Sequence, residues 1–344
     1  MNAAGLDAER VLRIGAGSEG VDLRRDAVRA LNHHSANESG PAPENFGTQL
    51  AQAAHFSLFP LGRPKGTSWH RQNPWGWISI QSGLVSTGKS GPPIDAALPG
   101  GGLPRLLLAH ITTEARRIRD RGGDPARVDL TGSLRSMTTS LGLKPGSRNR
   151  AVLAQLHATM SARVTFTTEQ ADVRGGKKGK WQHSVWLPSV ARELSLWVPE
   201  QQPLDDFEPY ITLSPEWLAM ILDDSKVVPA RLDVLAQLAG KPMAMDVLTW
   251  LANVTYALDQ GRQASRIFFW QDLYQEFTHD YDRLTHFRAK WRTALVEALR
   301  YYPGAQVDPE HPHPTDQRQT VVKVTRSPLF IERKRQSSVD GRSS

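Results

Sequence analysis

The stretch that most constrains the fold of this chain is Leu103–Arg119, LPRLLLAHITTEARRIR. Its apolar residues recur at helical spacing and form one face, while arginines crowd its final turns. We interpret it as the first helix of a domain that the following segments complete. The apolar residues are Leu103, Leu106, Leu107, Ile111 and Ala115, and the arginines are Arg116, Arg117 and Arg119.

The segments after this helix predict two more helices and then a hairpin. Asp129–Leu141 and Ser147–Ser161 have helical patterns, and Val164–Thr168 and Trp181–Trp186 have strand patterns. Between the two strands lies Val173–Lys180, a glycine-rich basic tip. Three helices followed by a hairpin are typical of a winged helix, whose third helix enters the major groove of DNA while the tip touches the backbone or minor groove.

A similar order returns in the second half of the chain. The best amphipathic helix is Asp282–Arg300, which follows a short predicted helix at Trp270–Phe277. Ala305–Asp308 and Thr320–Thr325 have the patterns of a second wing. Further helices are expected at Ser214–Asp224, Leu232–Leu238 and Ala244–Leu258.

The fold class expected is therefore α+β, mainly helical, with two tandem winged-helix domains between a flexible N-terminal segment and a basic tail. Pro199–Glu208, rich in proline and acid, is the predicted linker. The boundaries expected are 1–55 for the flexible segment, whose function the sequence does not indicate, 56–200 and 205–331 for the two domains, and 332–344 for a disordered tail.

Composition limits the classes of partner and of chemistry. The 344 residues carry a formal charge of +7, which favours a polyanionic partner such as nucleic acid. The absence of cysteine excludes disulfides, cysteine nucleophiles and thiolate zinc sites. No apolar run is long enough for a transmembrane helix and no signal sequence is evident, so we expect a cytoplasmic protein without a membrane partner.

Two motifs suggest enzymes, but their surroundings argue against both. Gly83–Ser90, GLVSTGKS, has the spacing of a nucleotide-binding P-loop, yet Pro92 and Pro93 forbid the helix that must begin there. His311 and His313, close after Tyr301 and Tyr302, suggest a rolling-circle nickase, but the prolines around them favour a surface loop. We therefore expect no enzyme, no cofactor and no metal site.

Several strings, taken in this order, resemble RepA-type plasmid replication initiator proteins over roughly residues 56–329. They are LPGGGLPRLLLAHITTEARR, LTGSLRSMTTSLGL, WLA with TYAL, and HDYDRLTHFRAKWRTALVEALRYYPGAQV. The resemblance implies tandem winged helices that bind repeated sites at a plasmid origin, recruit host replication proteins, can dimerise and often regulate their own transcription. Pro309–Gln319, a polar insertion, and the long Gly/Ser/Pro-rich stretch before Leu98 depart from the pattern.

The predicted function is thus initiation of plasmid replication through double-stranded DNA. A winged-helix transcriptional regulator, a nickase or NTPase, and a structural or RNA-associated basic protein remain as alternatives. The residues expected to contact DNA are those that share the outward face of a third helix, lie just after it or form its wing tip: Arg148, Arg150, Gln155, Arg163, Lys177, Lys178 and Lys180 in the first domain, and Arg283, His286, Arg288, Lys290 and Arg292 in the second.

Overall fold

The structure is a computed structural model of α+β class, and it describes residues 58–73, 76–85, 92–130, 133–171, 181–186, 189–196, 209–223, 231–277, 281–316 and 318–330. The predictions for residues 1–55, for the tip Val173–Lys180 and for the tail 332–344 lie outside these ranges. None of the helices in these ranges combines the length and the hydrophobicity that a membrane span requires.

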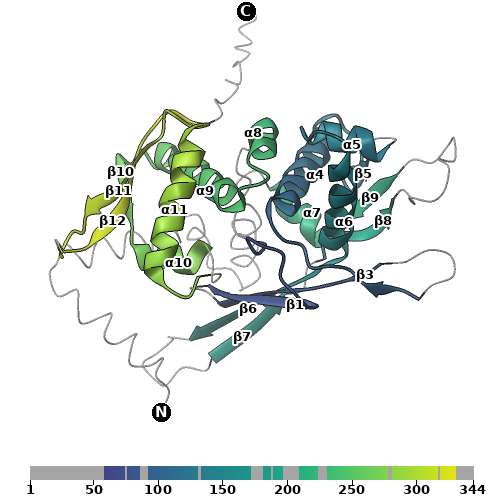
Figure 1. Cartoon of the computed structure of the whole chain (residues 1–344), viewed down its shortest axis with the longest axis horizontal. Coiled ribbons are helices and arrows are strands. Elements are labelled where there is room, and N and C mark those ends of the chain that lie inside the picture. The colour runs from purple at the N-terminus through teal and green to yellow at the C-terminus, as the bar shows by residue number, and fades with distance from the viewer. Residues whose placement is uncertain are drawn as a thin grey trace, which may run out of the picture.

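Helices form the upper part of the molecule and small sheets lie around them (Figure 1). The helices are α4 (Gly102–Asp120), α5 (Leu134–Ser140), α6 (Ser147–Ser161), α7 (Pro215–Leu222), α8 (Leu232–Gln237), α9 (Pro242–Gln260), α10 (Trp270–Phe277) and α11 (Leu284–Leu299). The strands are β1 (Ser68–Asn73), β2 (Gly76–Gln81), β3 (Leu84–Val85), β4 (Ile94–Asp95), β5 (Arg127–Asp129), β6 (Arg163–Ala171), β7 (Trp181–Trp186), β8 (Ala191–Ser195), β9 (Tyr210–Leu213), β10 (Ser265–Phe268), β11 (Gln306–Pro312) and β12 (Thr320–Thr325).

The hairpin that follows α6 belongs to a larger sheet than the sequence predicts. β6 pairs with β7, as expected, but also with β2, which gives an antiparallel sheet in the order β1-β2-β6-β7. Ile78 and Ile80 of β2, with Val164 and Phe166 of β6, are buried on the face toward the helices. The chain before α4 therefore belongs to the same sheet as the hairpin that follows α6.

The second half follows the order α9, β10, α10, α11, β11, β12, and its three strands form a sheet in the order β10-β12-β11. The core between its helices is aromatic. Trp250, Trp270, Phe277, Phe287 and Trp291 are buried and meet mainly edge to face, with ring centroids 5.4 Å apart for Trp270 and Trp291. Such pairs contribute roughly 0.5–1.5 kcal/mol each beyond burial, so α10 and α11 are held firmly together.

The strand β11 corrects the loop predicted at His311 and Pro312. His311 pairs with Val321 and Pro312 with Thr320, after a bulge that begins at Asp308. Proline is tolerated here because β11 is the edge strand of its sheet, where a missing N–H breaks no ladder bond.

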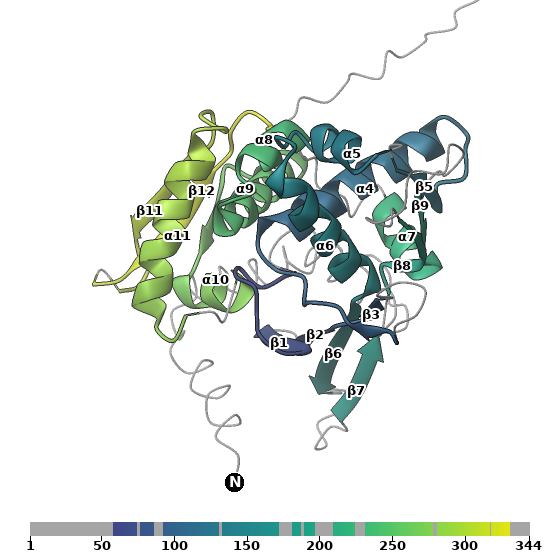
Figure 2. The same cartoon turned by 45° about the vertical axis from the view of Figure 1, so that its right-hand side comes forward.

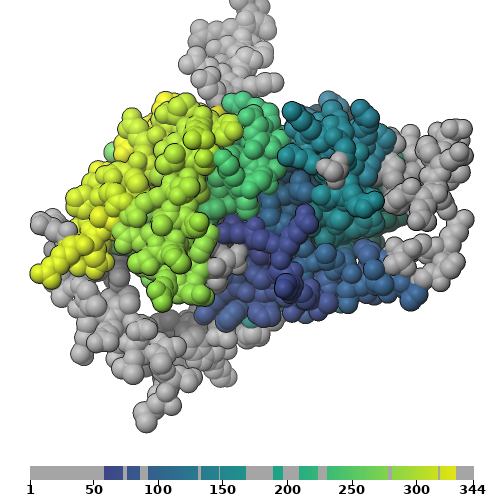
Figure 3. All heavy atoms as spheres, viewed as in Figure 1, coloured from purple at the N-terminus to yellow at the C-terminus, as the bar shows by residue number. Residues whose placement is uncertain are grey.

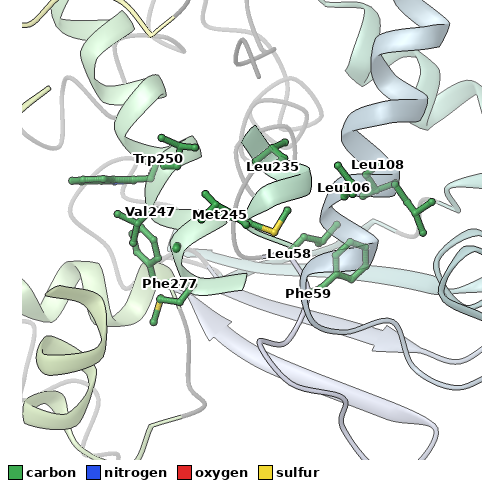
Figure 4. Close-up of a cluster of buried hydrophobic side chains, with 14 of the residues drawn as sticks. Leu58, Phe59, Leu106, Leu108, Leu235, Met245, Val247, Trp250 and Phe277 are labelled. Atoms are coloured by element: carbon green, nitrogen blue, oxygen red, sulfur yellow. The ribbon is translucent and has the colours of Figure 1, made fainter. Parts of the chain in front are cut away.

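The two halves share one hydrophobic core. Figure 4 shows Leu58, Phe59 and Leu106 of the first half beside Leu235 and Met245 of the second. Figure 2 shows α8 and α9 between α4 and α11. The predicted boundary at residue 205 does not separate packed units, because β9 pairs with β5 and β8 of the first half.

A buried ion pair joins α4 to α9 at this junction. The Nε atom of Arg105 lies 2.6 Å from Oδ1 of Asp246, and Nη2 lies 2.7 Å from Oδ2. The two side chains are 7% and 1% exposed. The guanidinium also donates to the carbonyl oxygens of Phe59 and Gly101, at 2.7 Å each. The pair is bidentate and its remaining donors are satisfied, the arrangement a buried charge requires.

Candidate nucleic-acid interface

In the first half, α5 and α6 form a helix–turn–helix whose turn is fixed by local chemistry. Ser133 caps α5 by accepting a hydrogen bond from the Ser136 N–H at 3.1 Å. Gly142 has φ +72°, a left-handed conformation that ends α5. Asn149 accepts from the Gly146 N–H at the start of α6. The turn is exposed at Gly142 and at residues 144–146, while α5 packs on α6 and α6 packs on α4.

The surface of this helix–turn–helix carries basic side chains and no acidic side chains from its own segment. Between Asp129 and Glu169 the chain contains no Asp or Glu. Its basic side chains on and between α5 and α6 are all exposed, namely Arg135, Lys144, Arg148 and Arg150. Such a surface attracts a polyanion because no neighbouring carboxylate in the segment neutralises it.

Two of the predicted residues on this surface are where the prediction put them, and one is not. Arg148 and Arg150 are exposed at the start of α6. Gln155 is 3% exposed, and its Oε1 accepts a hydrogen bond from the Gly100 N–H at 3.2 Å. The prediction that Gln155 faces outward is therefore wrong. It ties α6 to the segment that leads into α4.

Arg163 is exposed but lies on β6, not on the surface of α6. Its neighbour Val164 is buried toward the helices, so by the alternation of a strand Arg163 lies on the outer face of β1-β2-β6-β7. The wing-tip lysines Lys177, Lys178 and Lys180 lie outside the described residues.

The sequence prediction missed Arg135 and Lys144, which lie on α5 and in the turn. Helical periodicity within α6 says nothing of them. The absence of acid from Asp129 to Glu169 was the signal that could have found them.

In the second half, some basic residues of α11 are exposed to solvent and others pack against neighbouring elements. Arg283, at the N-cap position, and His286 and Lys290 on the helix are exposed, as predicted. Arg288 and Arg292 are half-buried, and each guanidinium lies 5.0 Å from the ring centroid of Trp270.

Both half-buried arginines have partners within the protein. Arg288 Nη2 donates to Thr320 Oγ1 at 2.6 Å, and Arg292 forms an ion pair with Glu310. Burial, and the neighbouring Arg292, lower the pKa of Arg288. The prediction that these two face DNA is corrected, because they fasten α11 to Trp270 and to strands β11 and β12.

The arginines at the end of α4 also have structural roles. Arg116 Nη1 donates to the Ile221 carbonyl and Arg119 Nη1 to the Leu222 carbonyl, each at 2.9 Å. These carbonyls end α7, where the helix dipole is negative. The arginines therefore cap α7.

The two basic helices, α6 and α11, come from different halves and lie toward the same side of the molecule (Figures 1 and 2). Figure 3, in the view of Figure 1, shows their segments in teal and yellow-green at the surface. α6 is buried along most of its C-terminal half, at Leu156, Ala158, Thr159 and Met160, so its exposed end is the one that carries Arg148 and Arg150.

The structure describes parts of the two enzyme-like motifs. Leu84–Val85 pairs with Ile94–Asp95 as a short hairpin, and residues 92–100 after the P-loop-like stretch are not helical. Residues 86–91, Lys89 among them, are not described. Tyr302 is buried, its hydroxyl 3.0 Å from Thr255 Oγ1. Among the described residues no group of three or more His, Asp or Glu is placed to hold a metal ion.

Comparison with known proteins gives similarity of fold. No protein-family model and no curated protein sequence matches the chain. A crystal structure of domains 2 and 3 of RctB is similar with a TM-score of 0.50 and 9% identity, covering 82% of this chain and 99% of the other. A second RctB domain 2–3 structure gives 0.44 and 9%, covering 78% and 94%. The first likeness spans both halves and shows that the two-part fold occurs elsewhere.

Proposed function

We propose that this chain is a replication initiator that binds repeated duplex DNA sites through two winged-helix units and performs no chemistry of its own. The observation that carries the proposal is the exposed, acid-free basic surface of α5 and α6, joined in one body to a second helix–turn–helix, α10 and α11. The resemblance of its residues to RepA-type initiators supports the same function.

The order of elements supports winged helices. In the second half, helix, strand, helix, helix and two strands follow in sequence, and the first strand pairs with the third. In the first half α4, β5, α5, α6, β6 and β7 repeat this order, although β5 pairs with β9 in a separate sheet. In such units the last helix enters the major groove and the hairpin lies over the neighbouring backbone.

In the proposed mechanism, one set of residues determines the affinity for DNA and another set determines the DNA sequence preferred. Arg135, Lys144, Arg148 and Arg150 neutralise phosphates around the first unit, which sets affinity and its dependence on salt. Side chains exposed on α11 reach base edges and set the sequence preferred. From the resemblance we further propose a plasmid origin as target, recruitment of host replication proteins, a homodimeric form and repression of the chain's own promoter.

The test is a footprint of the full chain on the DNA that flanks its own gene, followed by binding measurements on the protected repeat. Protected direct repeats spaced by whole helical turns, about 10 base pairs each, are expected. Arg148→Gln and Arg150→Gln should each lower the slope of log affinity against log salt by about one.

The matched control is Arg117→Gln, which removes the same charge from an exposed arginine that already pairs with Glu114 at 2.5 Å. If the control lowers the slope as much as the α6 variants, only net charge matters and the proposed surface is wrong. Maintenance of a plasmid that carries the repeats separates an initiator from a transcriptional regulator. A regulator would bind the repeats without supporting replication.

A further inference from the structure

The outward stripe of α11 has no charge. Four exposed residues follow one another at spacings of four, four and three, and each ends in a methyl group: Thr285, Ala289, Thr293 and Val296. The solvent face of a helix normally carries charged and polar side chains. Val296 is 58% exposed and is one of four large apolar side chains that the described part of the chain leaves in solvent.

The hydroxyl of Thr293, within this methyl stripe, is bonded to the backbone of its own helix. Thr293 Oγ1 donates to the Ala289 carbonyl oxygen of its own helix at 3.0 Å. A hydroxyl committed to the backbone four residues earlier is less available for a partner. The methyl group is then the part of this exposed side chain left for a partner, one helical turn from exposed Ala289.

Basic side chains lie beside the methyl stripe. His286 and Lys290 are exposed one position along from Thr285 and Ala289, and Arg283 is exposed at the start of the helix. Glu297, the acid of α11, is held by Lys241 at 2.7 Å and by Arg300 at 3.0 Å. An uncharged stripe beside the cationic side chains of Lys290 and Arg283 fits a polyanion whose grooves contain apolar groups. In the major groove of duplex DNA that group is the C5 methyl of thymine.

We infer that α11 reads thymine methyl groups in the major groove through Thr285, Ala289, Thr293 and Val296, with His286 and Lys290 on the adjacent phosphates. This rests on the proposed duplex-binding function and adds the chemical feature that the second unit recognises. The repeats that the chain prefers then contain A·T pairs where α11 lies, and their thymine methyls, not only their hydrogen-bonding edges, are read.

The test replaces thymine by deoxyuridine, which pairs identically but lacks the methyl, one position at a time in the repeat protected by the full chain. Loss of a contacted methyl should weaken binding about fourfold. Thr293→Ser removes the protein methyl and keeps the hydroxyl, and should weaken binding to the thymine repeat by a similar factor. It should also abolish the effect of deoxyuridine at one position.

The matched variant is Thr293→Val, which keeps methyl groups and removes the hydroxyl, and it should bind like the unaltered chain. The inference is overturned if every deoxyuridine repeat binds as tightly as the thymine repeat while the salt slope stays normal, or if Thr293→Val loses binding and Thr293→Ser retains it. If the chain shows no preference for any duplex over random DNA, the proposed function fails first, which is a different result.

Discussion

Removal of one partner of the Arg105–Asp246 pair should be among the most destabilising single changes in this protein. Arg105→Met leaves the Asp246 carboxylate, 1% exposed, without its cation, and removes the guanidinium's hydrogen bonds to the carbonyls of Phe59 and Gly101. An unpaired buried charge costs about 3–5 kcal/mol. Asp246→Leu leaves the guanidinium unpaired and should cost a similar amount.

The double variant Arg105→Met/Asp246→Leu separates charge pairing from general disruption. With both charges gone, the double variant should be more stable than the sum of the single effects predicts, by about 2–3 kcal/mol. The assay is urea unfolding of the full chain at fixed protein concentration, followed by tryptophan fluorescence and by circular dichroism, so that separate melting of the two halves becomes visible.

An exposed pair in the same chain provides the control. Arg231 and Asp233 lie 2.6 Å apart but are 48% and 59% exposed, so their coupling should stay below about 1 kcal/mol. The reasoning is refuted if Arg105→Met costs less than about 1 kcal/mol, or if the buried pair couples no more strongly than the exposed pair.

Three further predictions concern other parts of the chain. Burial raises the pKa of Glu276 from 4.5 to about 7, so between these pH values the folded protein holds a proton that the unfolded chain releases. The free energy of unfolding should therefore fall by up to about 3 kcal/mol as the pH rises from 4.5 to 7. Glu276→Gln should flatten this dependence in thermal melts at several pH values. A Cβ on Gly102 would lie 2.1 Å from the Ala239 carbonyl oxygen, so Gly102→Ala should destabilise the protein by about 1–3 kcal/mol. The control is Gly240→Ala, whose Cβ would have nothing within 4 Å and which should be neutral or slightly stabilising. Equal effects of the two variants in urea unfolding would contradict this. Tyr302→Phe should cost about 1–2 kcal/mol of stability, because the Tyr302 hydroxyl donates a hydrogen bond to the Pro328 carbonyl. The side chain is buried, so binding of the DNA repeat should be unchanged. A loss of affinity in the binding assay would contradict this.

Much of the helical framework could be predicted from periodicity alone. Ser147–Ser161 was predicted as a helix and is α6, and Asp282–Arg300 contains α11. Periodicity fails where the answer depends on segments far away in sequence. Nothing local to Trp77 or Thr167 reveals that they are paired neighbours, so the four-stranded sheet was not predicted.

The predicted interface was limited in the same way. Helical spacing groups Gln155 with Arg148, but only the packing of Gly100 against α6 shows that Gln155 is buried. The spacing of Arg288 and Arg292 likewise places them on one flank of a helix. It cannot show that Trp270, on another helix, lies under both guanidiniums.

The shared core and the buried ion pair mean that α6 and α11, the two helices proposed to contact DNA, do not move independently of each other. Under the proposed function, the fixed distance between the two helices sets the spacing of the DNA segments that they can contact at the same time. Inserting five base pairs between the two contacted segments would turn one of them by about half a helical turn, to the opposite side of the duplex. One of the two helices would then lose its contact with the DNA. Spacing between contacts, as well as the bases themselves, would become part of what this protein recognises.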